Sequence, residues 1–289
     1  MTPLVAAGSP LDHVFQWIYV KSGEGSFGFT ILSNHVIMQI IAALVLLLLV
    51  PRFVRLRDTG DAVQDLTPRG FGNFIESICH YLRAEVARPI LHDYTDRFIP
   101  YIWSIFFYVL TVNLLGLLPL EPLTRGFTRS VFDAHHGFGG SATGNIFVTG
   151  TLAAITFFMV VINGLRLGGK QYIAHFCPGP LWLSPLLVPV EIIGLLAKMF
   201  ALCVRLFANM VAGHVLLAVL LGFVAATYYA FGAGIATGVG LLVSVVSVAF
   251  NMLELFVAFL QAYIFTFLTT LFIGQAIIFH HNGHEAGAH

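Results

Sequence analysis

The chain has 289 residues, of which 58% are hydrophobic and only 10% are charged, and its 14 acidic residues balance its 14 lysines and arginines. A soluble domain carries roughly 25% charged residues, so this composition excludes a soluble protein and indicates an integral membrane protein. The absence of net positive charge argues against a nucleic-acid partner. Three widely spaced cysteines also exclude a disulfide framework.

The first apolar segments have the length of simple membrane spans. A transmembrane helix needs about 20 apolar residues, and such segments are found at residues 33–50, 98–118 and 146–165. Residues 171–190 are long enough to span a membrane but contain four prolines. Proline removes a backbone donor and clashes with the preceding turn, so we expect a broken approach segment there.

Between the first two spans lies a segment of different character. Thr67 and Pro68 are typical of a helix start, and apolar residues then recur at helical spacing: Phe71, Phe74, Ile75, Ile78, Leu82 and Val86. This pattern predicts an amphipathic helix over residues 67–90 that lies at the membrane interface. A helix within a soluble loop is the alternative.

The last part of the chain predicts two helices longer than a membrane is thick. No proline occurs between Pro189 and Tyr229, and forty helical residues measure about 60 Å, twice the hydrocarbon core of about 30 Å. Such a helix must tilt or bend. FGAGIATG (231–238) is the expected turn, followed by a second long helix. We therefore predict a long, strongly tilted helical hairpin over residues 187–280.

Together these elements predict an all-α integral membrane protein, a single membrane domain over residues 1–289. It would contain about five to six membrane helices and one interfacial amphipathic helix. With five spans, nine basic residues fall on one side of the membrane and three on the other. The more basic side is normally cytoplasmic, which places the N-terminal segment 1–30 outside and the His-rich tail 281–289 in the cytoplasm.

The sequence RLFANMVAGHVLLAVLLGF (205–223) places an arginine at the head of a long uncharged run. After Arg205, no Asp, Glu, Lys or Arg occurs until Glu254. At 100° per residue, one face of the first long helix carries four polar or charged residues: Glu191, Lys198, Arg205 and Asn209. His214 falls on the opposite face. The last helix carries a second polar stripe: Asn251, Glu254 and Gln261.

Each of these residues also has a purely structural interpretation. An intramembrane amide often joins two helices by a hydrogen bond, a single histidine often serves packing, and Arg205 with Glu254 would make a buried ion pair. However, intramembrane charges usually face the bundle interior or a wet path, and this set exceeds what one structural pair needs. Haem ligation is not expected, because His214 is the histidine that we place deep in an apolar span. The sequence predicts no cofactor and no metal site.

Several motifs resemble one family closely. LLAKMFALCVRLFANMVAGHVLL (195–217) resembles the signature of subunit a of the F-type ATP synthase, R-L-F-x-N-M followed by a small pair and an ionisable residue. LQAYIFTFLTTLFIG (260–274) resembles the last-helix signature Q-A-x-I-F. NLLGLLP (113–119) and TGNIFVTGTLAAITF (143–157) resemble the earlier spans, so the resemblance covers most of residues 30–280.

The resemblance implies a membrane stator that sits against a rotating c-ring. Such a subunit has no catalytic residue of its own; it carries protons through two offset half-channels to the ring carboxylates, so that ion flow drives rotation and ATP synthesis. Its implied partners are the c-ring, the peripheral-stalk subunit b, the remaining ATP synthase subunits and membrane lipid. The implied location is a bacterial inner membrane.

The resemblance also assigns roles to individual residues. Arg205 matches the essential stator arginine, and Asn209 and Gln261 match its polar neighbours. His214 and Glu254 match a pair in which many bacterial members carry the acid on the first helix and the histidine on the second; in this chain the two are exchanged. The minor candidates are Glu191 and Lys198 toward the cytoplasmic end, Asn251, and Glu121. Glu121 lies just downstream of Gly116, a position where some relatives have an aspartate. The loop 128–142 matches no part of the family.

The resemblance explains why an arginine would lie inside the membrane. A low-dielectric site favours the protonated form of a ring carboxyl, and a guanidinium that is always charged would let this carboxyl ionise transiently. The same charge would repel a proton passing directly between the half-channels. A secondary transporter that binds an anionic substrate through Arg205 is the alternative, although its usual internal repeats are not found. A structural membrane scaffold would leave the polar stripes unexplained.

Overall fold

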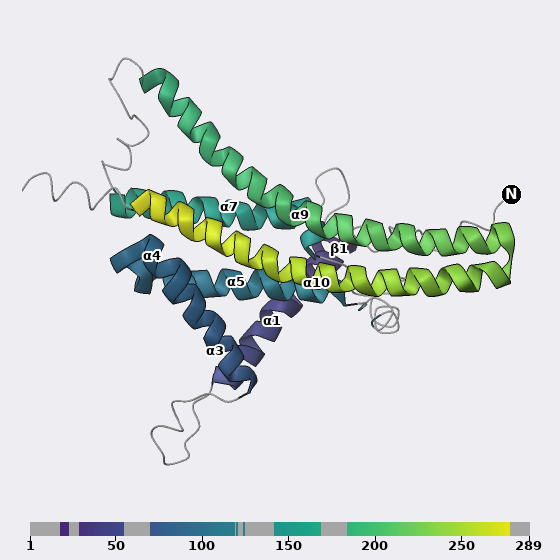
Figure 1. Ribbon diagram of the computed structural model, residues 1–289. Coiled ribbons are helices and arrows are strands. Elements are labelled where there is room, and N and C mark those ends of the chain that lie inside the picture. Colours follow the sequence, from purple (N-terminus) through teal and green to yellow (C-terminus); the bar gives the residue numbers. More distant parts are fainter. Residues whose placement is uncertain are drawn as a thin grey trace, which may run out of the picture. The chain divides into compact units, whose positions relative to one another are not determined.

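The computed structural model describes residues 18–22, 29–54, 70–118, 120, 124, 142–168 and 184–277. Side chains are described for most, but not all, of them. Five helices in this part of the chain are long and apolar enough to cross a membrane. They are formed by α1 (Asn34–Val54), the segment that ends in α5 (Thr95–Leu117), α7 (Ile146–Asn163), α9 (Ser184–Phe231) and α10 (Ala233–Ile277), as Figure 1 shows.

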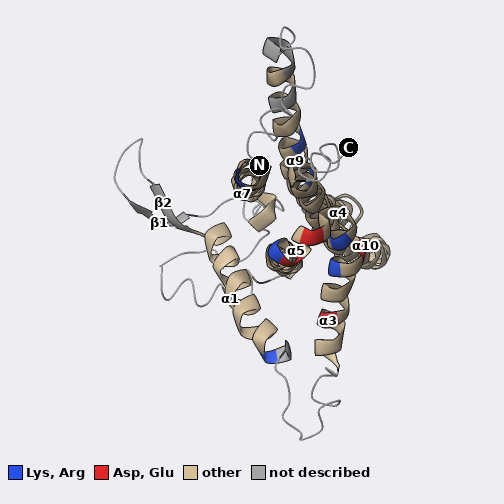
Figure 2. Ribbon diagram, turned by 90° about the vertical axis from the view of Figure 1, so that its left-hand side faces the viewer, with Lys and Arg blue, Asp and Glu red and all other residues tan. Residues whose placement is uncertain are grey.

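The predicted class, an all-α integral membrane protein, is confirmed. Charged side chains are sparse along the described helices (Figure 2). One small addition was not predicted: two short antiparallel strands, β1 (Ile18–Ser22) and β2 (Phe29–Ser33), precede α1. The π-helix η4 (Gly164–Gly168) extends α7 beyond its predicted end.

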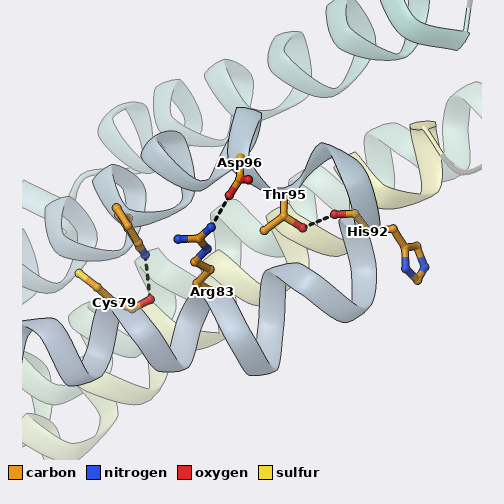
Figure 3. Close-up of polar contacts among 6 residues, drawn as sticks. Cys79, Arg83, His92, Thr95 and Asp96 are labelled. Carbon is orange, nitrogen blue, oxygen red and sulfur yellow. Dashed lines mark hydrogen bonds and ion pairs between the residues drawn. The ribbon is translucent and has the colours of Figure 1, made fainter.

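Residues 71–117 form two helical arms joined by a sharp turn. The first arm comprises α3 (Phe71–Tyr81), the π-helix η1 (Leu82–Ala87) and α4 (Arg88–Leu91). The second arm is α5, which follows the 3-10 turn η2 (His92–Tyr94). His92 has a positive φ of 47°, and its carbonyl accepts a hydrogen bond of 2.6 Å from Thr95 Oγ1 (Figure 3).

Polar contacts hold the two arms together. Arg83 forms an ion pair of 2.6 Å with Asp96, and Trp103 Nε1 donates to the Cys79 carbonyl at 3.1 Å (Figure 3). The first arm corresponds to the amphipathic helix predicted over 67–90, whose first three residues lie outside the described part. Within its apolar stripe, some side chains are buried and others, including Phe71 and Phe74, are exposed. The exposed members leave an apolar edge suited to lipid.

The chain divides into two compact units, and each long helix contributes a portion to both. Unit 1 comprises Met1–Ala43, Leu110–Thr149 and Val204–Gln261, and unit 2 comprises Leu44–Val109, Gly150–Cys203 and Ala262–His289. A hydrophobic cluster fills the core of unit 2: Ala87, Leu91, Phe98, Ile99, Ile102, Val160, Met199, Phe272, Ile273 and Ile277. Arg205 and the polar residues of α9 and α10 from there to Gln261 belong to unit 1.

The two last helices form the predicted hairpin, with a tighter turn than expected. α9 has 48 residues and α10 has 45, so each is about 70 Å long and must cross a core of about 30 Å at a steep tilt. The turn is confined to Gly232, whose φ of 80° favours glycine. The expectation of a turn over 231–238 was therefore too long, because one left-handed residue suffices to end one helix and start the next.

Candidate functional site

Arg205 lies on an exposed flank of α9. In this part of the helix, Leu206 and Met210 are buried, whereas Arg205 and Asn209 are exposed. Within the described part of the chain, Arg205 and Glu254 form no ion pair with each other. The alternative in which these two residues make a buried structural pair is therefore not observed, and the guanidinium is presented away from the interior of this chain.

Glu254 lies inside unit 1, against the backbone of α9. Its side chain is only 8% exposed. A Cβ atom added to Gly213 would collide with Glu254 Oε1 and Cδ, so the carboxyl group occupies the space that any other residue at position 213 would need. The next residue is the half-buried His214. The structure thus brings Glu254 to the segment of α9 that carries its predicted partner.

The carboxyl group of Glu254 is incompletely satisfied. Its Oε1 atom is buried and has no hydrogen-bond partner among the described residues. A buried polar atom without a hydrogen bond costs about 1–3 kcal/mol.

Asn209 and Gln261 connect the two long helices one turn from Arg205. Asn209 Nδ2 donates to Gln261 Oε1 at 3.0 Å, and Gln261 is 3% exposed. Gln261 Nε2 is buried and, among the described residues, has no hydrogen-bond partner. The hydrogen bond fixes the position of Asn209 on the same flank as Arg205.

The polar stripe predicted on α10 is divided by the packing. Glu254 and Gln261 are buried together with Ala258, which lies between them on the same face. Asn251 is exposed instead. Asn251 is therefore separated from the other two polar residues of its helix.

The remaining predicted residues lie elsewhere. In unit 2, Lys198 is exposed and its ammonium group lies 5.8 Å from the centre of the Phe272 ring, within the range of a cation–π contact. Glu191 lies within α9, but its side chain is outside the described part. Glu121, most of the loop 128–142 and the tail 281–289 also lie outside the described residues.

Sequence reasoning missed two features of unit 1. Gly213 was noted only as a member of the small pair in the family signature. Its contact with Glu254 joins two residues far apart in the chain, so the sequence alone does not show it. His35 was passed over, although it is 2% exposed in the first turn of α1. The sequence did offer one signal for His35, because this residue lies inside the predicted span 33–50.

Comparisons with known proteins show the family of this chain. Residues 36–274 match the family described as ATP synthase A chain. The chain is 39% identical to the ATP synthase subunit a of Chloroherpeton thalassium, over 91% of this chain and 72% of that relative. It is 37% identical to the ATP synthase subunit a of Chlorobium phaeobacteroides, over 92% and 71%. It is 40% identical to the one of an Anaeromyxobacter species, over 88% and 55%. The chain therefore belongs to the ATP synthase A chain family.

Proposed function

We propose that this chain, the proton-translocating stator subunit of an F-type ATP synthase, moves protons through two offset half-channels that load and unload c-ring carboxylates. The proposal rests on the exposure of Arg205 and on its lack of an ion pair with Glu254. The guanidinium is exposed on α9 and forms no ion pair with Glu254 in the described part of the chain. An intramembrane charge is costly unless it is paired, and among the described residues Arg205 makes no ion pair. A carboxylate on another chain would supply that partner.

In this mechanism Arg205 acts as a fixed positive charge. A ring carboxyl that leaves the lipid meets the guanidinium, which stabilises the ionised form and allows the proton to leave. After reprotonation on the other side, the neutral carboxyl is no longer held and re-enters the lipid. The same charge repels a free proton, so a proton crosses the membrane only by travelling with the ring.

The Asn209–Gln261 hydrogen bond supports a fixed position for this charge. It joins α9 and α10 one turn from Arg205, at 3.0 Å. Because the long helices are held in register there, the surface offered to the ring does not shift as each carboxylate passes. Apolar side chains that are exposed on α10, such as Phe256 and Leu253, fit a partner helix or lipid.

We assign the outer half-channel to His214 and Glu254. Histidine titrates near neutral pH, and the Glu254 oxygen without a hydrogen bond is available to accept a proton. Gly213 lets the carboxyl approach α9 next to His214. A proton that enters from outside would pass between these two groups before it reaches a ring carboxylate beside Arg205.

We assign the inner half-channel to the part of α9 that precedes Arg205. Glu191 lies fourteen residues earlier, about 21 Å along a helix, and Lys198 lies between them. With the N-terminus outside and the C-terminus in the cytoplasm, this part of α9 is cytoplasmic. The contact between Lys198 and the buried Phe272 ring supports a fixed direction for the ammonium group.

As a member of this family, the chain is a component of the ATP synthase complex and a multi-pass protein of an energy-coupling membrane. We propose further that it is non-catalytic, that residues 187–280 face the c-ring, and that residues 67–90 lie at the interface. Subunit b of the peripheral stalk would be a second partner. A bacterial inner membrane is the proposed location.

The test is Arg205→Ala in the complete complex, measured as ATP-driven proton pumping in sealed vesicles. The complex should assemble with its c-ring, while pumping is lost because the ring carboxylates have no fixed counter-charge. Arg166→Ala, which removes an arginine of η4, is the matched control and should pump normally. Near-normal pumping by the Arg205→Ala complex would refute the proposal.

A further inference from the structure

The start of α1 carries a buried histidine that helix capping does not explain. Ser33, Asn34 and His35 are at most 2% exposed. Ser33 Oγ accepts a hydrogen bond from the Val36 N–H at 3.5 Å, and Asn34 Oδ1 accepts one from the His35 N–H at 3.0 Å. These two side chains serve the unpaired donors of the first turn. The imidazole of His35 takes part in neither bond.

Other buried polar groups occur at the ends of two further helices of unit 1. Asn113, near the end of α5, accepts a hydrogen bond of 3.0 Å from Thr143 in the 3-10 turn η3 (Ala142–Gly144). Both residues are 2% exposed. Thr149, in the first turn of α7, is fully buried. A buried polar group is costly to remove from water unless it is hydrogen-bonded.

The order of the membrane crossings puts these groups on one side of the membrane. With five spans, α1, α5 and α7 are successive crossings, so the start of α1, the end of α5 and the start of α7 share a side. The fourth crossing, α9, returns toward that side, and His214 lies beyond Arg205 in this direction. His35, Asn113 and Thr143 therefore belong to the same unit and the same side as His214 and Glu254.

We propose that His35 is a further proton-carrying residue of the outer half-channel, at an entrance that Asn113 and Thr143 also line. The inference rests on the proposed function, since it requires the outer half-channel at His214 and Glu254. The imidazole takes one proton from the outer aqueous phase, releases one proton toward that pair and returns to its neutral form. Asn113 and Thr143, held together by their hydrogen bond, offer fixed donors and acceptors along this route.

The first experiment compares His35→Gln with His35→Glu. Glutamine retains size and hydrogen bonding but carries no proton, whereas glutamate carries one. We expect passive proton flux through the complex, measured in liposomes per assembled complex, to fall at least fivefold in His35→Gln and to recover by twofold or more in His35→Glu. His80→Gln, at an exposed histidine of α3, is the matched control and should leave flux unchanged.

Two results would overturn the inference. One is wild-type flux in His35→Gln, and the other is an equal loss in both variants, which would indicate a structural role. If Arg205→Ala retains coupled pumping, the proposed function itself fails. If Arg205→Ala loses pumping while His35→Gln conducts normally, only the role of His35 fails.

A second measurement uses the unaltered chain, in case His35→Gln does not assemble. Diethyl pyrocarbonate, a small reagent that acylates imidazoles, is applied to the outer face of sealed vesicles that contain the complete complex. Modification of His35, followed by mass spectrometry, should parallel the loss of flux, and hydroxylamine should reverse both. Complete modification without loss of flux, or no modification at all, would contradict an entrance at His35.

Discussion

Replacing Gly213 by alanine tests whether the position of Glu254 matters for proton transfer. The new Cβ would collide with Glu254 Oε1 and Cδ. These atoms lie at the far end of a flexible side chain, so the carboxyl group moves rather than the helices. Forcing it off its preferred rotamer costs about 0.5–1.5 kcal/mol, which corresponds to roughly a twofold to tenfold change in rate.

We therefore expect the Gly213→Ala complex to assemble and to show proton flux reduced by that factor. Passive flux is measured in liposomes under an imposed gradient and normalised to assembled complex. Shortening the displaced side chain, in Gly213→Ala with Glu254→Asp, should recover part of the loss. Gly222→Ala is the control on the same helix, because no atom lies within 4 Å of its added Cβ. Unchanged flux in Gly213→Ala would refute the reasoning.

Two further predictions concern the proposed half-channels. His214→Leu and Glu254→Leu should each slow proton flux in an assembled complex. The exchanged double variant, His214→Glu with Glu254→His, should recover part of this flux. Single variants that assemble in smaller amounts but keep normal flux per assembled complex would indicate a structural pair. A cysteine at position 191 should react with a charged thiol reagent only from the cytoplasmic side, in a chain whose other cysteines are replaced; labelling from outside would contradict its place in the inner half-channel.

The helices were predictable because long apolar runs and their charged ends are local properties of the chain. α5 and α7 begin and end within a few residues of the predicted limits. α1 continues through Pro51 to Val54, although a proline inside a helix removes one backbone hydrogen bond. The turn at Gly232 was overestimated because FGAGIATG contains three glycines, of which only the first needs a left-handed backbone.

The site was predictable only in part. Counting at 100° per residue placed Asn209 on the same flank as Arg205, as observed. It did not reveal which face of α10 packs inward, and so it grouped Asn251 with Glu254. The contact between Gly213 and Glu254 joins positions 41 residues apart, and the burial of His35 depends on the packing of unit 1. Neither leaves a periodic signal in the sequence.

The most direct test of the central claim is the passive proton permeability of the membrane sector that contains Arg205→Ala. Liposomes with the assembled sector receive an imposed proton gradient, and the leak is compared with that of the unaltered sector. If the guanidinium separates the two half-channels, the leak through Arg205→Ala should persist or rise while coupled pumping is lost. A sector that becomes tight to protons on losing this one charge would contradict the account.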